Sequence, residues 1–373
     1  MSAAFPTNLA ALSERLSAID PPRYGSTRNF LTGAVTRLSP YIARGVITLP
    51  KVLESILNRY PMGKALPLIQ QLAWREYFQR VWWKEKENLQ RDIRQPQTQV
   101  AHHELPRAIA EANTGVEEVD AAIRDLMQTG YLHNHARLYV AMFACNIARA
   151  HWSSPARWMY YHLLDGDIAS NTLSWQWVAG SFSAKKYYAN QDNINKYSGS
   201  NQRNTVLDKS YEELMEMPVP DHLQATIVPD LQTNLPITET LALNQHLPLL
   251  LYHSYQIDPE WFSGVEANRV LVLEPSHFQQ YPVSPAVMQF ILELAKEFIP
   301  GIQIYVGEAK DIPSLDAFPS IHFKDHPIAH HFPGQATAPA WMFPDADYTG
   351  QGFFGYWKKC EKALFKISRA HSQ

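Results

Sequence analysis

Two acidic residues and two tryptophans lie within thirteen consecutive residues, from position 165 to position 177. The carboxylates of Asp165 and Asp167 are costly to bury unless a cation or hydrogen-bond donors accompany them. Trp175 and Trp177 add flat aromatic surfaces that suit stacking or electron transfer. Further upstream, Arg137 offers a cation that can neutralise one carboxylate. Together these residues predict a buried aromatic cofactor held by charge-assisted hydrogen bonds.

The composition limits the class of protein. A chain of 373 residues, 46% hydrophobic and 18% charged, is ordinary for a globular protein and long enough for about two domains. No stretch approaches about 18 apolar residues, so we expect no membrane span and no membrane partner. The N-terminus lacks the features of a signal peptide, and Cys145 and Cys360 are the only cysteines. We therefore expect a cytoplasmic protein without a disulfide framework, whose oligomeric state the sequence does not define.

Charge is divided unevenly along the chain. Residues 1–210 carry 24 Lys and Arg against 17 Asp and Glu, a net charge of +7. Residues 211–373 carry 9 against 19, a net charge of −10. A basic surface suits the phosphate backbone of a nucleic acid, although charge alone is more often a solvated surface. The basic half also contains the predicted cofactor pocket, which favours contact with nucleic acid.

Helical periodicity dominates residues 1–208. Thr114 and Glu117 predict a capping box ahead of a helix that Gly130 ends. Residues 66–83 form a second amphipathic segment that is rich in aromatic residues, and residues 138–148 form a third. We therefore expect residues 1–208 to form an all-helical domain.

The character of the sequence changes after residue 208. Residues 209–245 contain several prolines and little periodicity, which predicts a linker. In residues 246–373, apolar runs at 249–252 and 270–273 are typical of buried parallel strands. Ser284 and Pro285 predict the start of a helix that ends near residue 299, before a strand at 302–306. The predicted fold is mainly α, with a smaller βαβ-containing domain at residues 246–373.

Five motifs, in order, resemble the FAD-binding domain of the DNA photolyase/cryptochrome family. They are residues 36–41, 74–78, 114–124, 133–137 and 165–177. The resemblance covers about residues 20–200. The family usually places an α/β antenna domain before this domain, whereas here an α/β segment follows it. We therefore expect a short member that lacks the usual N-terminal antenna domain, and the sequence leaves open whether the C-terminal unit binds a chromophore.

The resemblance implies a folded FAD buried among the helices. The implied cofactor-binding residues are Tyr24, Thr36, Arg37, Leu38, Ser39, Arg75, Phe78, Arg137, Asp165, Asp167 and Asn171. Residues 36–39 match the segment that holds the phosphates, and a plain helix start at Ser39 is the alternative. Arg137 and Asp165 match a salt bridge beside the isoalloxazine ring, and Asp167 matches the carboxylate at its pyrimidine edge. A structural ion pair is the alternative for these residues.

Three residues match the family's electron-transfer positions. Asn171 matches the residue beside the redox-active nitrogen, where photolyases usually have Asn, plant cryptochromes Asp and animal cryptochromes Cys. Helix capping is the alternative role. Trp175 and Trp152 match the first two members of a tryptophan chain, and packing in the core is the alternative for both. The surface member has no clear match near Gln99; the nearest candidates are Trp82, Trp83 and Trp158.

The resemblance also implies a pocket for a flipped pyrimidine dimer. Trp74 and Trp177 match the two indoles that sandwich the dimer, and base stacking of this kind contributes about 1–3 kcal/mol per base. Asn134 and Leu138 match pocket residues of cyclobutane-dimer enzymes, whereas (6-4) photolyases tend to have His at both positions. Gln71 stands where the cyclobutane-dimer enzymes have Glu, so it lacks the carboxylate charge. A surface position on its helix is the alternative for Gln71.

Two further groups of residues carry weaker signals. Four histidines are close in sequence, but Pro327 breaks the helix that their spacing would require, so we expect no metal site there. These are His322, His326, His330 and His331. A basic and aromatic stretch follows the cofactor motif, and it suits either a DNA backbone or a solvated loop. It comprises Lys185, Lys186, Tyr187, Tyr188, Lys196, Tyr197 and Arg203.

The sequence therefore predicts a light-driven, FAD-dependent lyase that repairs cyclobutane pyrimidine dimers in DNA. Single-stranded or exposed lesions are the expected preference, because they cost less to flip. A cryptochrome-like blue-light photoreceptor without efficient repair is the alternative. A flavoprotein that binds nucleic acid but ignores light is a third hypothesis.

Overall fold

Helices form most of the regular structure up to residue 216. The computed structural model describes residues 5–238 and 240–371. The helices of this part are α1 (Leu9–Ser17), α2 (Pro21–Thr27), α3 (Ser39–Ala43), α4 (Leu49–Leu57), α5 (Met62–Glu85), α6 (Arg107–Ala110), α7 (Glu117–Thr129), α8 (Asn134–Met142), α9 (Ser153–His162), α10 (Ile168–Ala179), α11 (Gln191–Ser198) and α12 (Tyr211–Glu216). The prediction of a helical first half is confirmed.

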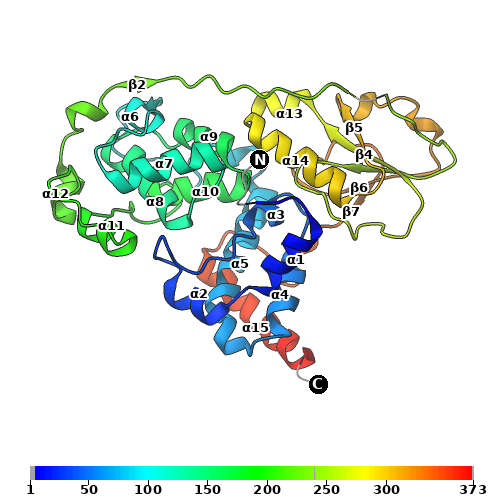
Figure 1. Ribbon diagram of the computed structural model, residues 1–373, viewed down its shortest axis with the longest axis horizontal. Helices are drawn as coiled ribbons and strands as arrows, with labels where there is room; N and C mark the ends of the chain where they lie inside the picture. Colours follow the sequence, from blue (N-terminus) through cyan, green and yellow to red (C-terminus); the bar gives the residue numbers. More distant parts are fainter. Residues whose placement is uncertain (1–4, 239, 372–373) are drawn as a thin grey trace.

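The long helix α5 lies at the centre of the molecule (Figure 1). It packs against α2, α4, α10 and α15 (Phe353–His371). Because neighbours surround it, apolar residues are buried on several sides of α5 rather than along one stripe. The aromatic segment predicted at 66–83 is thus a helix, with Trp82 in the hydrophobic core.

The start of α7 differs from the prediction. The helix begins at Glu117, and Val116 at its N-cap makes no side-chain hydrogen bond. The backbone N–H and the hydroxyl of Thr114 instead both donate to Asp120, each at 2.7 Å. The predicted capping box is therefore wrong, because the acidic partner of Thr114 lies one turn further along. Gly130 ends the helix with a left-handed φ of 69°, as predicted.

Residues beyond 245 form a five-stranded parallel sheet in the order β5-β4-β3-β6-β7. The strands are β3 (Leu249–Tyr252), β4 (Asn268–Leu273), β5 (Gln303–Val306), β6 (Ile321–Lys324) and β7 (Gln335–Thr337), with helices α13 (Pro275–Gln280) and α14 (Pro285–Phe298). The predicted strands are confirmed, and Ser284 caps α14 by accepting from the N–H of Val287. Sequence reasoning missed β6 and β7, because neither reads as a continuous apolar run.

Residues 209–245 cross the surface from the helical part to the sheet (Figure 1). This segment contains α12 and the short strand β2 (Thr226–Ile227), which pairs antiparallel with β1 (Leu105–Pro106). Beyond the sheet, the chain returns to the N-terminal helices, where α15 packs against α5. One hydrophobic core accordingly contains residues of α4, α5, β3, α14 and α15. The division into domains at 208 and 245 stays a prediction.

Among the described residues, none forms a helix that is both long and apolar enough to cross a bilayer.

Candidate functional site

A cavity of about 520 Å³ lies among the helices of the first half. This volume is within the range of small-molecule and cofactor pockets. Most of the residues predicted from the sequence line it together. These are Tyr24, Ser39, Gln71, Trp74, Arg75, Phe78, Asn134, Arg137, Leu138, Asp165, Asp167, Asn171, Trp175 and Trp177. The predicted residues Thr36, Arg37, Leu38 and Trp152 do not line this cavity.

Three helices each present a stripe of residues to the cavity. On α5 the stripe is Gln71, Trp74, Arg75 and Phe78; on α8 it is Asn134, Arg137, Leu138 and Ala141; on α10 it is Ser170, Asn171, Ser174, Trp175 and Val178. Spacings of three and four residues place side chains on one face of a helix. The helical period therefore explains why residues distant in sequence meet in this cavity.

Arg137 and Asp165 form a buried ion pair at the cavity wall. One terminal nitrogen of Arg137 donates to both carboxylate oxygens of Asp165, at 2.9 and 2.8 Å, while its Nε donates to the carbonyl of Leu132 at 2.9 Å. Burial alone would raise the pKa of Asp165, but the Arg137 guanidinium and a hydrogen bond from Ser39 outweigh it and lower that pKa. Asp165 is therefore ionised at neutral pH.

Asp167 connects α10 to α5. Its carboxylate caps α10 by accepting from the N–H of Ser170 at 2.6 Å, and it accepts from Nε2 of Gln79 at 2.5 Å. The guanidinium of Arg75 lies 3.7 Å away. Sequence reasoning missed Gln79, although its position one turn after Arg75 on α5 is a signal that could have found it. The carboxylate of Asp167 is thus a hydrogen-bond acceptor that is held in place by neighbouring donor groups.

Asn171 lies within α10 rather than at its cap, because Asp167 is the N-cap. Its Nδ2 donates to the carbonyl of Ala156 at 2.9 Å. This bond uses one of the two N–H groups of the amide, so the amide oxygen and the second N–H are available to a ligand. The capping alternative for Asn171 is wrong.

The segment predicted to hold phosphates lies beside the main cavity. Thr36 and Arg37 line a neighbouring cavity that shares Tyr24 with the main one. The guanidinium of Arg37 lies 5.9 Å from the ring centre of Tyr131, which lines the main cavity. Leu38 is buried in the core, so only its backbone is available to a ligand. Ser39 begins α3, so the predicted helix start is present together with the cavity contact.

The two predicted relay tryptophans are both buried but occupy different places. Trp175 lines the main cavity, whereas Trp152 lines another cavity that it shares with Asn171. The indole N–H of Trp152 donates to Asp92 at 2.7 Å. Trp82 and Trp83 lie against histidines of the α/β region, at ring distances of 5.1 and 5.0 Å. The route beyond Trp152 stays a prediction.

Known proteins share the sequence of this region. The sequence model of the FAD binding domain of DNA photolyase matches residues 68–218, which include most of α5 and all of α8 and α10. Residues 68–218 are therefore similar to the FAD-binding domain of the DNA photolyase/cryptochrome family. FAD is the cofactor of this domain.

Relatives within the photolyase/cryptochrome family carry two kinds of name. The deoxyribodipyrimidine photo-lyase of Streptomyces griseus is 32% identical over 40% of this chain and 32% of its own length. That of Thermus thermophilus is 35% identical over 43% of this chain and 39% of its own. A cryptochrome DASH of Natronomonas pharaonis is 32% identical over 42% of this chain and 35% of its own. The chain thus spans about a third of the length of these curated relatives.

The cavity residues fit a flavin cofactor of this family. The buried hydroxyl of Ser170 has no hydrogen-bond partner within the described residues and lines the cavity. The cavity also offers the acceptors of Asp167 and Asn171, the guanidinium of Arg75 and the flat ring of Trp175. Such a set of donors, acceptors and aromatic surface suits a planar heterocycle with polar edges. These residue roles remain predictions.

The substrate-side residues predicted by the family resemblance also meet at this cavity. Gln71 lines it, so a surface position on α5 is not its role. Trp177 is 36% exposed, and its ring lies 5.8 Å from that of Tyr187. Trp74 is half-buried and lines the same cavity. The cavity therefore extends from the buried Asp165 to an indole that solvent reaches.

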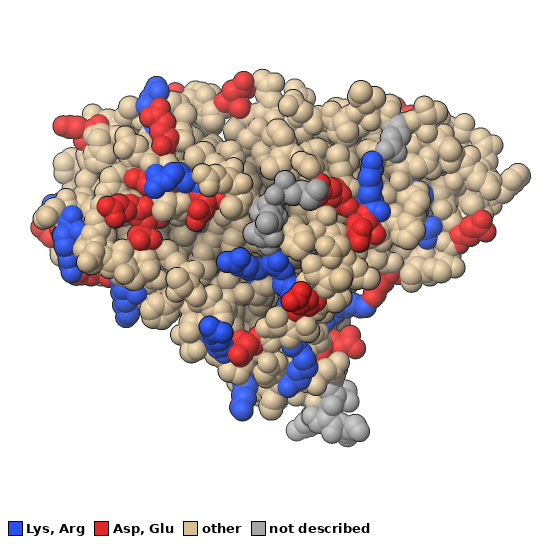
Figure 2. Space-filling view, in the orientation of Figure 1, with Lys and Arg blue, Asp and Glu red and all other residues tan. Residues whose placement is uncertain are grey.

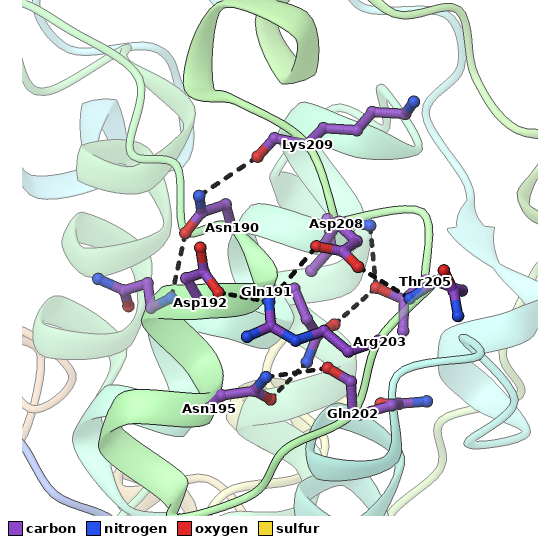
Figure 3. A network of polar contacts seen from close by, with 12 residues as sticks. Asn190, Gln191, Asp192, Asn195, Gln202, Arg203, Thr205, Asp208 and Lys209 are labelled. Carbon is purple, nitrogen blue, oxygen red and sulfur yellow. Dashed lines mark hydrogen bonds and ion pairs between the residues drawn. The ribbon is translucent and has the colours of Figure 1, made fainter.

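The basic stretch after α10 is largely engaged within the protein. Figure 3 shows Arg203 between Asp192 and Asp208, at 2.6 and 3.7 Å, in a network that also ties Thr205 to Gln191. Lys186 donates to the carbonyl of Thr98 at 2.7 Å. These bonds favour a structural role for Arg203 and Lys186. On the face shown in Figure 2, Lys and Arg are spread out with Asp and Glu among them.

The four histidines of the C-terminal half separate in the structure. His326 stacks on Tyr255 at 5.0 Å, and His330 lies 2.7 Å from Asp325. His331 instead bonds to Glu274 at 2.8 Å. Oxygen atoms of Glu274 and Glu308 and a ring nitrogen of His331 lie within 4.8 Å of one another. Sequence reasoning missed this group, because its members follow different strands.

Proposed function

We propose that this chain is a light-driven, FAD-dependent lyase that repairs cyclobutane pyrimidine dimers in DNA. The observation that carries the proposal is the continuity of one cavity. The Arg137–Asp165 pair and the indoles of Trp74 and Trp177, the residues suited to stack a base, all line this one cavity. Donor and acceptor of an electron would both be held within this cavity.

When bound and reduced, FAD supplies the excited electron that splits the dimer. The chain itself binds and orients. Arg137 is held in place at the cavity wall by its hydrogen bonds to Leu132 and Asp165. Asp167 is held by its bond from Ser170 and offers a hydrogen-bond acceptor to the cofactor. The burial of these groups excludes water, which strengthens each electrostatic contact.

The substrate end would recognise the lesion by stacking and by neutral hydrogen bonds. Trp74 and Trp177 offer two aromatic surfaces, and each stacked base contributes about 1–3 kcal/mol. Asn134 and Leu138 provide no acid, which favours a cyclobutane dimer over a lesion whose repair needs a proton donor. Gln71 can both accept from and donate to a base edge, but it brings no charge.

A cryptochrome-like photoreceptor is the second candidate. Gln71 favours it, because it departs from the Glu that the cyclobutane-dimer enzymes have at this position. The presence of both photolyases and a cryptochrome DASH among the relatives leaves both functions within the family. Under this alternative, the flavin would respond to light while dimers stay intact.

The test is dimer repair by the full chain. Protein with reduced FAD would be illuminated with blue light in the presence of a thymine-dimer oligonucleotide, offered single-stranded or in a duplex, with a dark control. Light-dependent recovery of thymines supports a photolyase, and we expect it to be faster on the single strand. Intact dimers, despite bound FAD that is photoreduced, would establish the photoreceptor alternative.

A matched pair of variants links repair to the cavity. Trp177→Ala should reduce dimer binding about tenfold through loss of one stacking surface, since a stacked base contributes about 1–3 kcal/mol and about 1.4 kcal/mol corresponds to a factor of ten. Tyr211→Ala is the control, because Tyr211 is similarly exposed, at 38%, and does not line the cavity. Equal losses in both variants would contradict a specific role of Trp177.

A further inference from the structure

The C-terminal helix reaches the back of the proposed substrate pocket. Phe353, the first residue of α15, stacks on Trp74 with ring centres 3.7 Å apart and an angle of 11° between the planes. Phe353 is only 4% exposed. Trp74 lines the cavity and Phe353 does not. The indole therefore stands between Phe353 and the cavity, with one of its two faces fully covered.

The same part of the chain is anchored to α5 by polar bonds. Glu76, completely buried, accepts from the backbone N–H groups of Met342 and Phe343 and from the hydroxyl of Tyr356. Tyr77 donates to the carbonyl of Gln351 at 3.0 Å. A buried carboxylate with several donors is costly to disrupt. The segment that packs behind Trp74 is thus held firmly against α5.

Two faces of α5 consequently serve two purposes. Trp74 and Arg75 face the cavity, whereas Glu76, Tyr77 and Arg80 face residues 341–360. An indole on a helix can rotate about its side-chain bonds unless its neighbours prevent it. A ring stacked at 3.7 Å removes that freedom on one side. The orientation of Trp74 is therefore set from behind by a residue almost 280 positions later in the chain.

We propose that Phe353 is a positioning residue for lesion recognition, which holds the Trp74 indole so that its free face can stack on a flipped base. This inference rests on the proposed function and assigns to the C-terminal helix a part in the substrate site. Preorganised aromatic rings bind better, because the entropy of ordering them is not lost on binding.

The experiment compares adjacent phenylalanines in the full chain with FAD bound. Phe353→Leu keeps apolar volume but removes the flat ring, and Phe354→Leu is the matched control, because Phe354 is 70% exposed. The readout is the ratio of the dissociation constants for undamaged and thymine-dimer oligonucleotides, measured in the dark. We expect Phe353→Leu to lower this ratio about tenfold, the loss expected for one weakened base stack. FAD content should stay unchanged, and Phe354→Leu should resemble the unmodified chain.

A double-mutant cycle separates positioning from general damage. In a Trp74→Ala background, Phe353→Leu should cause no further loss of discrimination. In the chain that retains Trp74, Phe353→Tyr should preserve discrimination, because tyrosine keeps the flat ring. A further loss in the absence of Trp74, or unaltered discrimination in Phe353→Leu, would overturn the inference while leaving the proposed function in place. If the unmodified chain does not distinguish damaged from undamaged DNA, the proposed function fails, and the inference fails with it.

Discussion

Removal of Arg137 should destabilise the protein, because the buried carboxylate of Asp165 would lose the cation that neutralises it. The side chain of Asp165 is 3% exposed and receives two hydrogen bonds from one Arg137 nitrogen, at 2.9 and 2.8 Å. Breaking a buried pair by removing one partner costs about 3–5 kcal/mol, because an uncompensated charge remains. We therefore expect Arg137→Ala to lower the free energy of unfolding by about that amount at pH 7.5, and to retain less FAD.

The pH dependence gives this prediction a sign. In the unmodified chain the pKa of Asp165 lies below its ordinary value of 3.8, so the stabilisation is complete above that pH and is lost as the pH falls further. Without Arg137, burial would dominate and the pKa of Asp165 would lie above the unfolded value. The folded variant would then bind a proton that the unfolded chain releases, so it should lose stability as the pH rises.

The assay is urea unfolding of the full chain at pH 4.5 and pH 7.5. The destabilisation caused by Arg137→Ala should be larger at the higher pH. The control is Arg203→Ala, which breaks an exposed pair with Asp192, where the side chains are 57% and 68% exposed. Such exposed pairs contribute little to stability, because solvent screens them. Equal losses from both variants, or a loss in Arg137→Ala that does not depend on pH, would refute the account of a buried, compensated charge.

Three other perturbations test the relay, the α/β region and the start of α7. Trp175→Phe should slow the photoreduction of FAD under blue light, and an unchanged rate would remove Trp175 from the electron route. Burial lowers the pKa of His277 to about 4, so its contribution to stability is full above pH 6.5 and is lost toward pH 4, at up to about 1.4 kcal/mol per pH unit. His277→Phe should therefore flatten the acid side of the stability curve in urea titrations, and an equally steep curve would exclude His277. Asp120→Ala should cost about 2–3 kcal/mol through two lost bonds to Thr114, whereas the exposed Asp125→Ala should change stability by less than about 0.5 kcal/mol in the same assay.

The family resemblance predicted most of the residues that line the site, and helical periodicity explains why they meet. Residues three and four positions apart on α5, α8 and α10 meet in one cavity, and the spacing within each motif is visible without a structure. The Arg137–Asp165 pair was also predictable, because a buried carboxylate needs a cation. In the sheet, β3 and β4 were predicted, since strands buried on both faces read as apolar runs.

The missed parts depend on contacts between distant segments. No local pattern indicates that Phe353 stacks on Trp74, or that Glu76 accepts from Met342 and Tyr356. The capping box failed for a different reason: the carboxylate of Asp120, rather than that of Glu117, accepts from the backbone N–H of Thr114, and it accepts from the Thr114 hydroxyl as well. Local sequence patterns indicate which residues could be hydrogen-bond partners, and tertiary packing determines which of these bonds form.

The two faces of α5 allow cofactor binding and lesion recognition to be separated. Arg75 and Gln79 interact with Asp167, so changes there should affect the cofactor end of the cavity. Phe353 packs against Trp74 and Tyr77 on α5 and does not line the cavity, so its loss should spare that end. A variant that keeps FAD but loses dimer discrimination would therefore locate the defect among the proposed substrate-binding residues. Because α15 packs against α5, such a result would assign the C-terminal part of this chain to the proposed recognition site.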